Sequence, residues 1–169
     1  MTQFTAHGPF KVPTTKLASG SKTIGKDQVA QFWESNDEFA EEVGVYVFAI
    51  KAGQGITPMY IGKATKSFAQ ESFATDKLNK YFHAMGGYLK GTPMMFFVMY
   101  PVKRGKVNVK EIGELEKFLI QQGRIINPNL VNKVHAKLPS WSIDGVLRSK
   151  TKRPTKQATT FRGAFSLAG

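Results

Sequence analysis

The pattern of apolar and polar positions along the chain predicts three strands. Residues 44–50 form a run of β-branched and aromatic side chains, and residues 59–63 form another after a glycine-containing turn. Two such runs joined by a short loop predict an antiparallel hairpin. A further apolar run, residues 94–100, predicts the third strand.

Helical spacing of apolar residues marks three further segments. The first is a short helix from residue 27 to residue 34 or 36, with Asp27 suited to cap it. The second covers residues 67–85, with a break near residues 74–76. The third covers residues 109–122, where Asn108 is suited to cap the start and a glycine follows the end.

The order of these elements predicts an α+β fold with a small three-stranded antiparallel sheet flanked by helices. Residues 1–42 are expected to form an N-terminal arm, irregular over its first 25 residues, and a short helix. Residues 43–133 would form the compact domain. Residues 134–169 would form a basic C-terminal extension that docks in part through its few apolar side chains.

Composition narrows the classes of protein that fit. The 169 residues suit one domain, and the lack of cysteine excludes disulfide scaffolds, thiol nucleophiles and thiolate zinc sites. No apolar run approaches the roughly 20 residues of a membrane-spanning helix, and the first residues lack the order of a secretory signal. We therefore expect a cytoplasmic protein that does not bind membranes.

The balance of charge predicts a polyanionic partner. Lys and Arg number 24 against 12 Asp and Glu, for a net charge of +12. Residues 51–110 carry ten basic and two acidic groups and residues 134–169 carry seven and one, whereas residues 111–133 are balanced. Two basic blocks predict a basic face that binds nucleic acid. A general solubilising excess of lysine is the plainer alternative.

Phosphate contacts are expected from basic side chains in both blocks. Such contacts give affinity and salt dependence without reading sequence. A solvated tail is the alternative for the four candidates near the end of the chain, Arg148, Lys150, Lys152 and Arg153. The candidates are Lys66, Lys80, Lys103, Arg104, Lys106, Arg148, Lys150, Lys152 and Arg153.

Three short motifs carry a resemblance to a known family. Gly44-Val45-Tyr46 lies in the first predicted strand and Tyr60-Ile61-Gly62 in the second. The third helix contains the run Glu114–Ile120, followed by Pro128 and Asn132. Together these motifs, within residues 43–133, resemble the GIY-YIG nuclease superfamily.

The resemblance implies a role for each matching residue. Tyr46 would act as the general base or orient the attacking water, and Tyr60 would hydrogen-bond a phosphate oxygen or that water. The ammonium of Lys63 would lower the tyrosine pKa from its usual value of about 10. Glu116 would ligate one divalent metal, Mg²⁺ or Mn²⁺, and Asn132 would brace the site.

The chain also departs from the family pattern. The family carries a phosphate-clamping arginine on the helix after its second motif, whereas this chain has no arginine before Arg104. Lys77 is expected to replace it, with Lys80 as the alternative, although neither offers the planar fork of a guanidinium. His83 follows at a spacing where many members carry a histidine.

Plainer interpretations of these residues stay open. The two tyrosines could be ordinary strand aromatics, Lys63 a solvated strand end, and His83 a surface histidine. Glu114 is the alternative metal ligand, but Glu116 borders the apolar stripe of its helix and is favoured.

The resemblance implies a metal-dependent endonuclease that hydrolyses phosphodiester bonds in DNA, with RNA as an open alternative. A catalytically impaired nucleic-acid-binding module on the same fold is the other interpretation. Symmetric cleavage of both strands by a domain with one site would require a homodimer.

Overall fold

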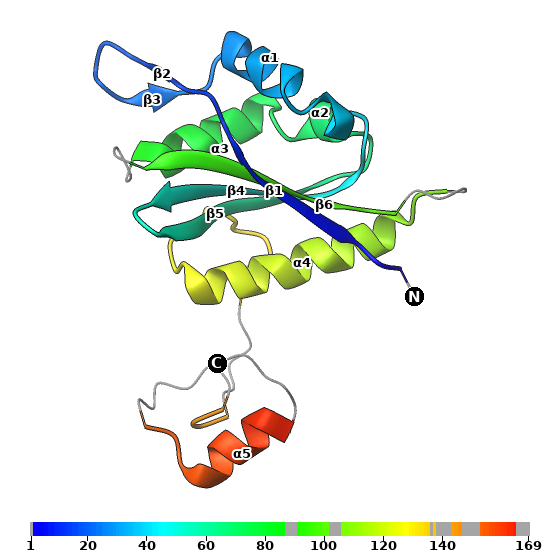
Figure 1. The fold of residues 1–169 in the computed structure, drawn as a ribbon, viewed down its shortest axis with the longest axis vertical. Helices are drawn as coiled ribbons and strands as arrows, with labels where there is room; N and C mark the ends of the chain where they lie inside the picture. Colours follow the sequence, from blue (N-terminus) through cyan, green and yellow to red (C-terminus); the bar gives the residue numbers. More distant parts are fainter. Residues whose placement is uncertain are drawn as a thin grey trace. The chain divides into compact units, whose positions relative to one another are not determined.

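The computed structural model describes residues 2–86, 91–101, 106–135, 137, 143–146 and 153–164. It divides the chain into two compact units, Met1–Ala136 and Lys137–Gly169. Among the described residues, the strands and every helix except α5 belong to the first unit (Figure 1).

The first unit is built on a four-stranded antiparallel sheet, so the α+β class is correct and the predicted count of three strands is wrong. The fourth strand comes from the segment expected to be an irregular arm. The strands follow one another across the sheet as β1 (Thr5–Lys11), β6 (Thr92–Met99), β4 (Gly44–Ala52) and β5 (Gly55–Ala64).

The sequence pattern did not predict this fourth strand, because β1 contains Gly8 and Pro9, two residues that usually interrupt strands. Proline is tolerated in an edge strand, and β1 pairs only with β6, with a register shift between His7 and Phe10. A short second sheet pairs β2 (Thr15–Lys16) with β3 (Lys22–Thr23).

Helices cover both faces of the main sheet, which gives the unit two hydrophobic cores (Figure 1). One core holds buried side chains of β4 together with Phe32, Phe68 and Tyr81 from three different helices. The other holds Val45 and Ile61 of the hairpin against the long helix α4. The helices are α1 (Lys26–Glu34), the 3₁₀ turn η1 (Asp37–Phe39), α2 (Phe68–Glu71), α3 (Thr75–Gly86) and α4 (Val109–Ile126).

Most predicted helix boundaries agree with these elements, but the predicted cap of the first helix is wrong, because Gly25 is the N-cap of α1 and Asp27 lies in its first turn. A break separates α2 from α3, as predicted, but it covers residues 72–74, two residues earlier than expected. The side chain of Asn108 caps α4 by accepting hydrogen bonds from the backbone N–H groups of Lys110 and Glu111. The predicted end of the third helix is wrong, because α4 continues through Gly123 to Ile126. Gly123 faces β5 and is part of a close contact between helix and strand.

The second unit contains α5 (Lys156–Ala164), and Val146 is buried within the part of this unit that the structure describes. None of the described helices combines the length and apolar character needed to span a bilayer.

Candidate active site

Two tyrosines on adjacent strands lie at the centre of the candidate site. Tyr46 on β4 is fully buried, and Tyr60 on β5 is 8% exposed. Their ring centroids are 6.3 Å apart. Tyr46 is paired across the hairpin with Gly62, and its ring occupies the space that a side chain at 62 would need. The second motif therefore requires glycine at its third position so that the tyrosine of the first motif can lie over it.

A pocket of about 400 Å³ opens beside these tyrosines. It brings together five of the residues predicted from the sequence, which come from two strands and two helices: Tyr46, Tyr60, Lys63, Lys77 and Glu116. Gln70, Glu71, Ala74 and Asp76, none of them predicted, complete its lining.

The two glutamates of α4 have different surroundings. The side chain of Glu116 is 15% exposed and lies in the pocket, where a carboxylate oxygen is 3.6 Å from Nζ of Lys63. Glu114 is 66% exposed and lies 4.0 Å from the ammonium of Lys110, one helical turn away. Of the two candidates, Glu116 is the one within reach of a ligand in the pocket.

Burial raises the pKa of Tyr46 far above the usual value, and the neighbouring Tyr60, Asp76, Glu71 and Glu116 shift it in the same direction. This is opposite to the lowering expected from Lys63, whose ammonium pairs with Glu116 instead. The Tyr46 hydroxyl therefore keeps its proton at neutral pH, and it donates a long hydrogen bond of 3.4 Å to the carbonyl of Glu71.

Burial also raises the pKa of Tyr60, although Lys77 opposes the shift. Tyr60 is thus the tyrosine with a positive charge nearby, and Tyr46 is the one surrounded by acidic groups. At neutral pH both phenols are hydrogen-bond donors.

Asp76 holds the two lysines that were expected to replace the family arginine. Its carboxylate accepts hydrogen bonds from Lys77 and, at 3.2 Å, from Lys80. The hydrogen bond from Lys77 is the main reason that the pKa of Asp76 is lowered. Lys77 faces the small pocket, whereas Nζ of Lys80 lies 4.9 Å from the ring centre of Tyr60. The carboxylate of Asp76 thus partly balances the two ammonium groups.

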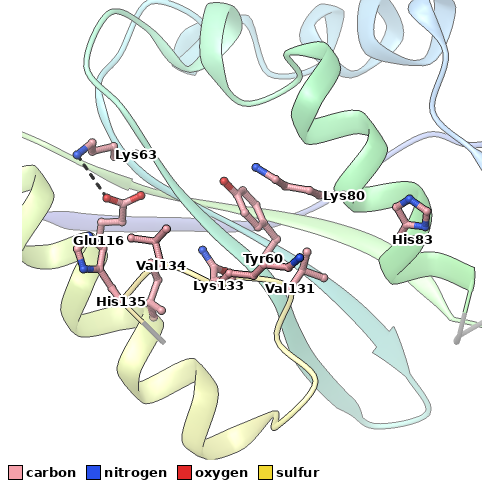
Figure 2. A pocket seen from close by; sticks show the side chains of 11 residues that line it. Tyr60, Lys63, Lys80, His83, Glu116, Val131, Lys133, Val134 and His135 are labelled. Atoms are coloured by element: carbon pink, nitrogen blue, oxygen red, sulfur yellow. Dashed lines mark ion pairs between the residues drawn. The ribbon is translucent and has the colours of Figure 1, made fainter. Parts of the chain in front are cut away.

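A larger pocket of about 770 Å³ shares Tyr60, Lys63 and Glu116 with the first (Figure 2). His83 and Asn132, both predicted site residues, line this pocket and are absent from the lining of the smaller one. Both polar atoms of the Asn132 side-chain amide form hydrogen bonds with β5. The oxygen accepts from Ile61 N–H at 2.9 Å, and the nitrogen donates to Ile61 C=O at 2.7 Å. This contact anchors the segment that follows α4 to the edge of β5, and the role of Asn132 in bracing the site stays a prediction.

Glu71 and Asp76 are the two charged residues of the small pocket that sequence reasoning missed. The carboxylate of Glu71 accepts from the backbone N–H groups of Thr65 and Lys66, at 2.6 and 2.7 Å, and so fixes the turn that follows β5. No periodicity marks such a contact in advance. Asp76 had a detectable signal, because an acid four residues before Lys80 predicts an ion pair on a helix.

The pocket offers few ligands to a metal ion. Among the residues that the structure describes, no group of three or more His, Asp or Glu side chains could hold one. Glu71 and Asp76 are engaged by backbone N–H groups and lysines, which leaves the Glu116 carboxylate beside Lys63. One carboxylate suits Mg²⁺ whose other ligands are waters and substrate phosphate, and it does not suit a metal held by protein alone.

The predicted phosphate contacts are placed only in part. Lys66, Lys106 and Arg153 are exposed, and Lys80 is half-buried between Asp76 and Tyr60. The other five, Lys103, Arg104, Arg148, Lys150 and Lys152, lie outside the described residues.

Chemically, the small pocket is lined by two phenols, two ammonium groups and three carboxylates. Glu71 is engaged by backbone N–H groups and Asp76 by lysines, and Glu116 lies beside Lys63. Hydroxyl and ammonium donors together favour a phosphate group. No protein-family model, no curated protein and no solved structure matches this chain, so the pocket itself is the basis for a functional proposal.

Proposed function

We propose that the chain is a metal-dependent endonuclease that hydrolyses phosphodiester bonds in DNA at the small pocket. The observation that carries the proposal is the convergence of Tyr46, Tyr60, Lys63, Lys77 and Glu116 on one pocket, from four separate elements. The excess of basic residues supports a polyanionic substrate.

In the proposed reaction a water oxygen bonds to phosphorus and the bond from phosphorus to one ester oxygen breaks. One proton of the water ends on the leaving oxygen, and the other ends on the phosphate monoester or in solvent. Lys77 and Lys63 would attract the phosphate, the phenol of Tyr60 would donate to a phosphate oxygen or to the water, and Tyr46 would orient the water. Mg²⁺ bound at Glu116 would stabilise the charge that develops on the phosphate.

The raised pKa of Tyr46 favours one of its two expected roles. A phenol that keeps its proton cannot take one from water, but it can orient that water as a hydrogen-bond partner. We therefore assign Tyr46 to orientation and not to general base catalysis.

The same observations also favour a second candidate, a nucleic-acid-binding module with impaired catalysis. Lys63 faces Glu116, Lys77 faces Asp76, and Tyr46 has no positive partner among the groups that shift its pKa. Such a module would bind DNA through its lysines and leave the phosphodiester bond intact.

Conversion of supercoiled plasmid to nicked circles, with Mg²⁺ or with EDTA, separates the two candidates. We expect nicking that needs Mg²⁺ and that falls at least about tenfold in Tyr46→Phe, which removes the hydroxyl and keeps the buried ring. Plasmid binding with no nicking by the unchanged protein would contradict the enzyme and support the module.

A further inference from the structure

The larger pocket combines features that the proposed hydrolysis does not need. Its volume, about 770 Å³, exceeds that of the pocket that holds the candidate catalytic groups. The two pockets meet at Tyr60, Lys63 and Glu116, so a chain with a phosphate in one can continue into the other. In Figure 2 the side chains of the larger pocket come from α3, β5, α4 and the segment that follows α4.

The charge of this pocket is complementary to a nucleic acid strand. Lys63, Lys80 and Lys133 line it together with two histidines, against the single carboxylate of Glu116. Lys133 is exposed, and no ion pair involving it occurs within the described part of the chain. Lysines placed in this way suit the phosphates next to the one that is cleaved.

The pocket also has an apolar wall, which would not bind charged phosphate groups. Ile120 of α4 is buried, Val131 is half-buried, and Val134 is 70% exposed. This wall is held in place, because Val131 N–H donates to the carbonyl of Met59 at 2.9 Å and Asn132 binds both backbone groups of Ile61. These hydrogen bonds hold the start of the segment that follows α4 against β5.

A base in a DNA duplex is stacked on its neighbours and cannot contact such a wall. An unpaired base exposes an apolar face, and single-strand-binding proteins combine a basic groove with surfaces on which bases pack. The rings of His83 and His135, which line the same pocket, offer further planar surfaces.

We propose that the larger pocket binds an unpaired nucleotide next to the phosphate that is cleaved, which makes single-stranded or frayed nucleic acid the substrate class. The proposal rests on the proposed function for the position of that phosphate. Its binding arm stands apart from hydrolysis, because binding can be measured without Mg²⁺.

The test is fluorescence anisotropy in EDTA with three labelled probes that have equal strand length: a single-stranded oligonucleotide, its duplex, and a single strand with a run of four abasic sites. We expect the intact single strand to bind at least about tenfold more tightly than the abasic strand, because both carry the same phosphates and differ in bases. Val134→Ser should weaken binding of the intact single strand about fivefold and leave duplex binding unchanged. Val109→Ser, the same substitution at another exposed valine outside the pocket, should alter neither.

The outcomes distinguish this inference from the proposed function. Equal affinity for the intact and abasic strands, or no effect of Val134→Ser, would overturn the inference even if the plasmid is nicked. Preference for the intact strand that depends on Val134, without cleavage of that strand or of the plasmid in Mg²⁺, would support the inference and overturn the hydrolysis. Lack of binding to all three probes would overturn both.

Discussion

The ring of Tyr46 lies directly against the backbone of Gly62, its partner on the adjacent strand, in the space where any larger residue would carry its side chain. The contact joins the two tripeptide motifs of the hairpin into one structural unit. The contact also helps to position Tyr46, which lines the small pocket.

Replacement of this glycine should destabilise the protein. Gly62→Ala would force a methyl group into the Tyr46 ring, and overpacking of a buried site costs about 1–3 kcal/mol. Gly55→Ala, on the same strand, is the matched control, because the nearest atom to a methyl group there is 3.8 Å away. Urea denaturation measures the two free energies of unfolding, and equal losses in both variants would contradict the contact.

The raised pKa of Tyr46 predicts how stability changes at alkaline pH. The folded state keeps the phenol proton above pH 10, where the unfolded chain releases it, so the stabilising effect of burial is complete below about pH 10 and is lost as pH rises further. Tyr46 should contribute a fall of up to about 1.4 kcal/mol per pH unit. The fall in the free energy of unfolding should be shallower in Tyr46→Phe.

Unfolding by urea between pH 7 and pH 11.5 tests this expectation. The interval from pH 7 to pH 9 is an internal control, since Tyr46 should make no difference to the slope there. Parallel curves for Tyr46→Phe and the unchanged protein above pH 10 would show that the phenol ionises normally in the folded state.

The bracing role of Asn132 predicts a loss of stability. Asn132→Ala would remove both hydrogen bonds to Ile61 at the edge of β5, at a cost of about 1–3 kcal/mol. Asn129→Ala is the control, because Asn129 is exposed and its hydrogen bond to Asn127 uses only the backbone N–H. A midpoint of thermal unfolding equal to that of the control would contradict the brace.

The position of Asp76 predicts a gain in affinity for nucleic acid. Asp76→Asn would remove the negative charge that holds Lys77 and Lys80 and would release two ammonium groups beside the pocket. We expect DNA to bind about threefold more tightly at low salt, with a steeper dependence on salt concentration. Glu41→Gln removes the same charge from an exposed position outside both pockets. An equal gain in affinity in that variant would show that the gain comes from net charge and not from the position of Asp76.

The hairpin and the cap of α4 were predictable because their signals are local. Residues 44–50 and 59–63 are apolar and aromatic runs joined by a glycine-containing turn, and Asn108 precedes an amphipathic helix. Strand β1 was not predictable in this way, because Gly8-Pro9 interrupts the local pattern and only the exposed edge of β6 makes the strand favourable.

The candidate site was predictable in its residue types and not in its electrostatics. Tyr46, Tyr60 and Glu116, which the motifs identify, line one pocket. The pairing of Lys63 with Glu116, by contrast, depends on how α4 packs against β5. Burial in the core raises the pKa of Tyr46, and the sequence of the tripeptide does not show how deeply this residue is buried.

The most direct test of the account compares two carboxylates on one helix. Glu116→Gln and Glu114→Gln remove the same charge from α4, two residues apart, and only Glu116 lies in the pocket. We predict that the Mg²⁺-dependent rate of plasmid nicking falls at least about 100-fold in Glu116→Gln and stays within about twofold of the unchanged protein in Glu114→Gln. Equal nicking rates in the two variants would contradict the claim that this pocket hydrolyses DNA.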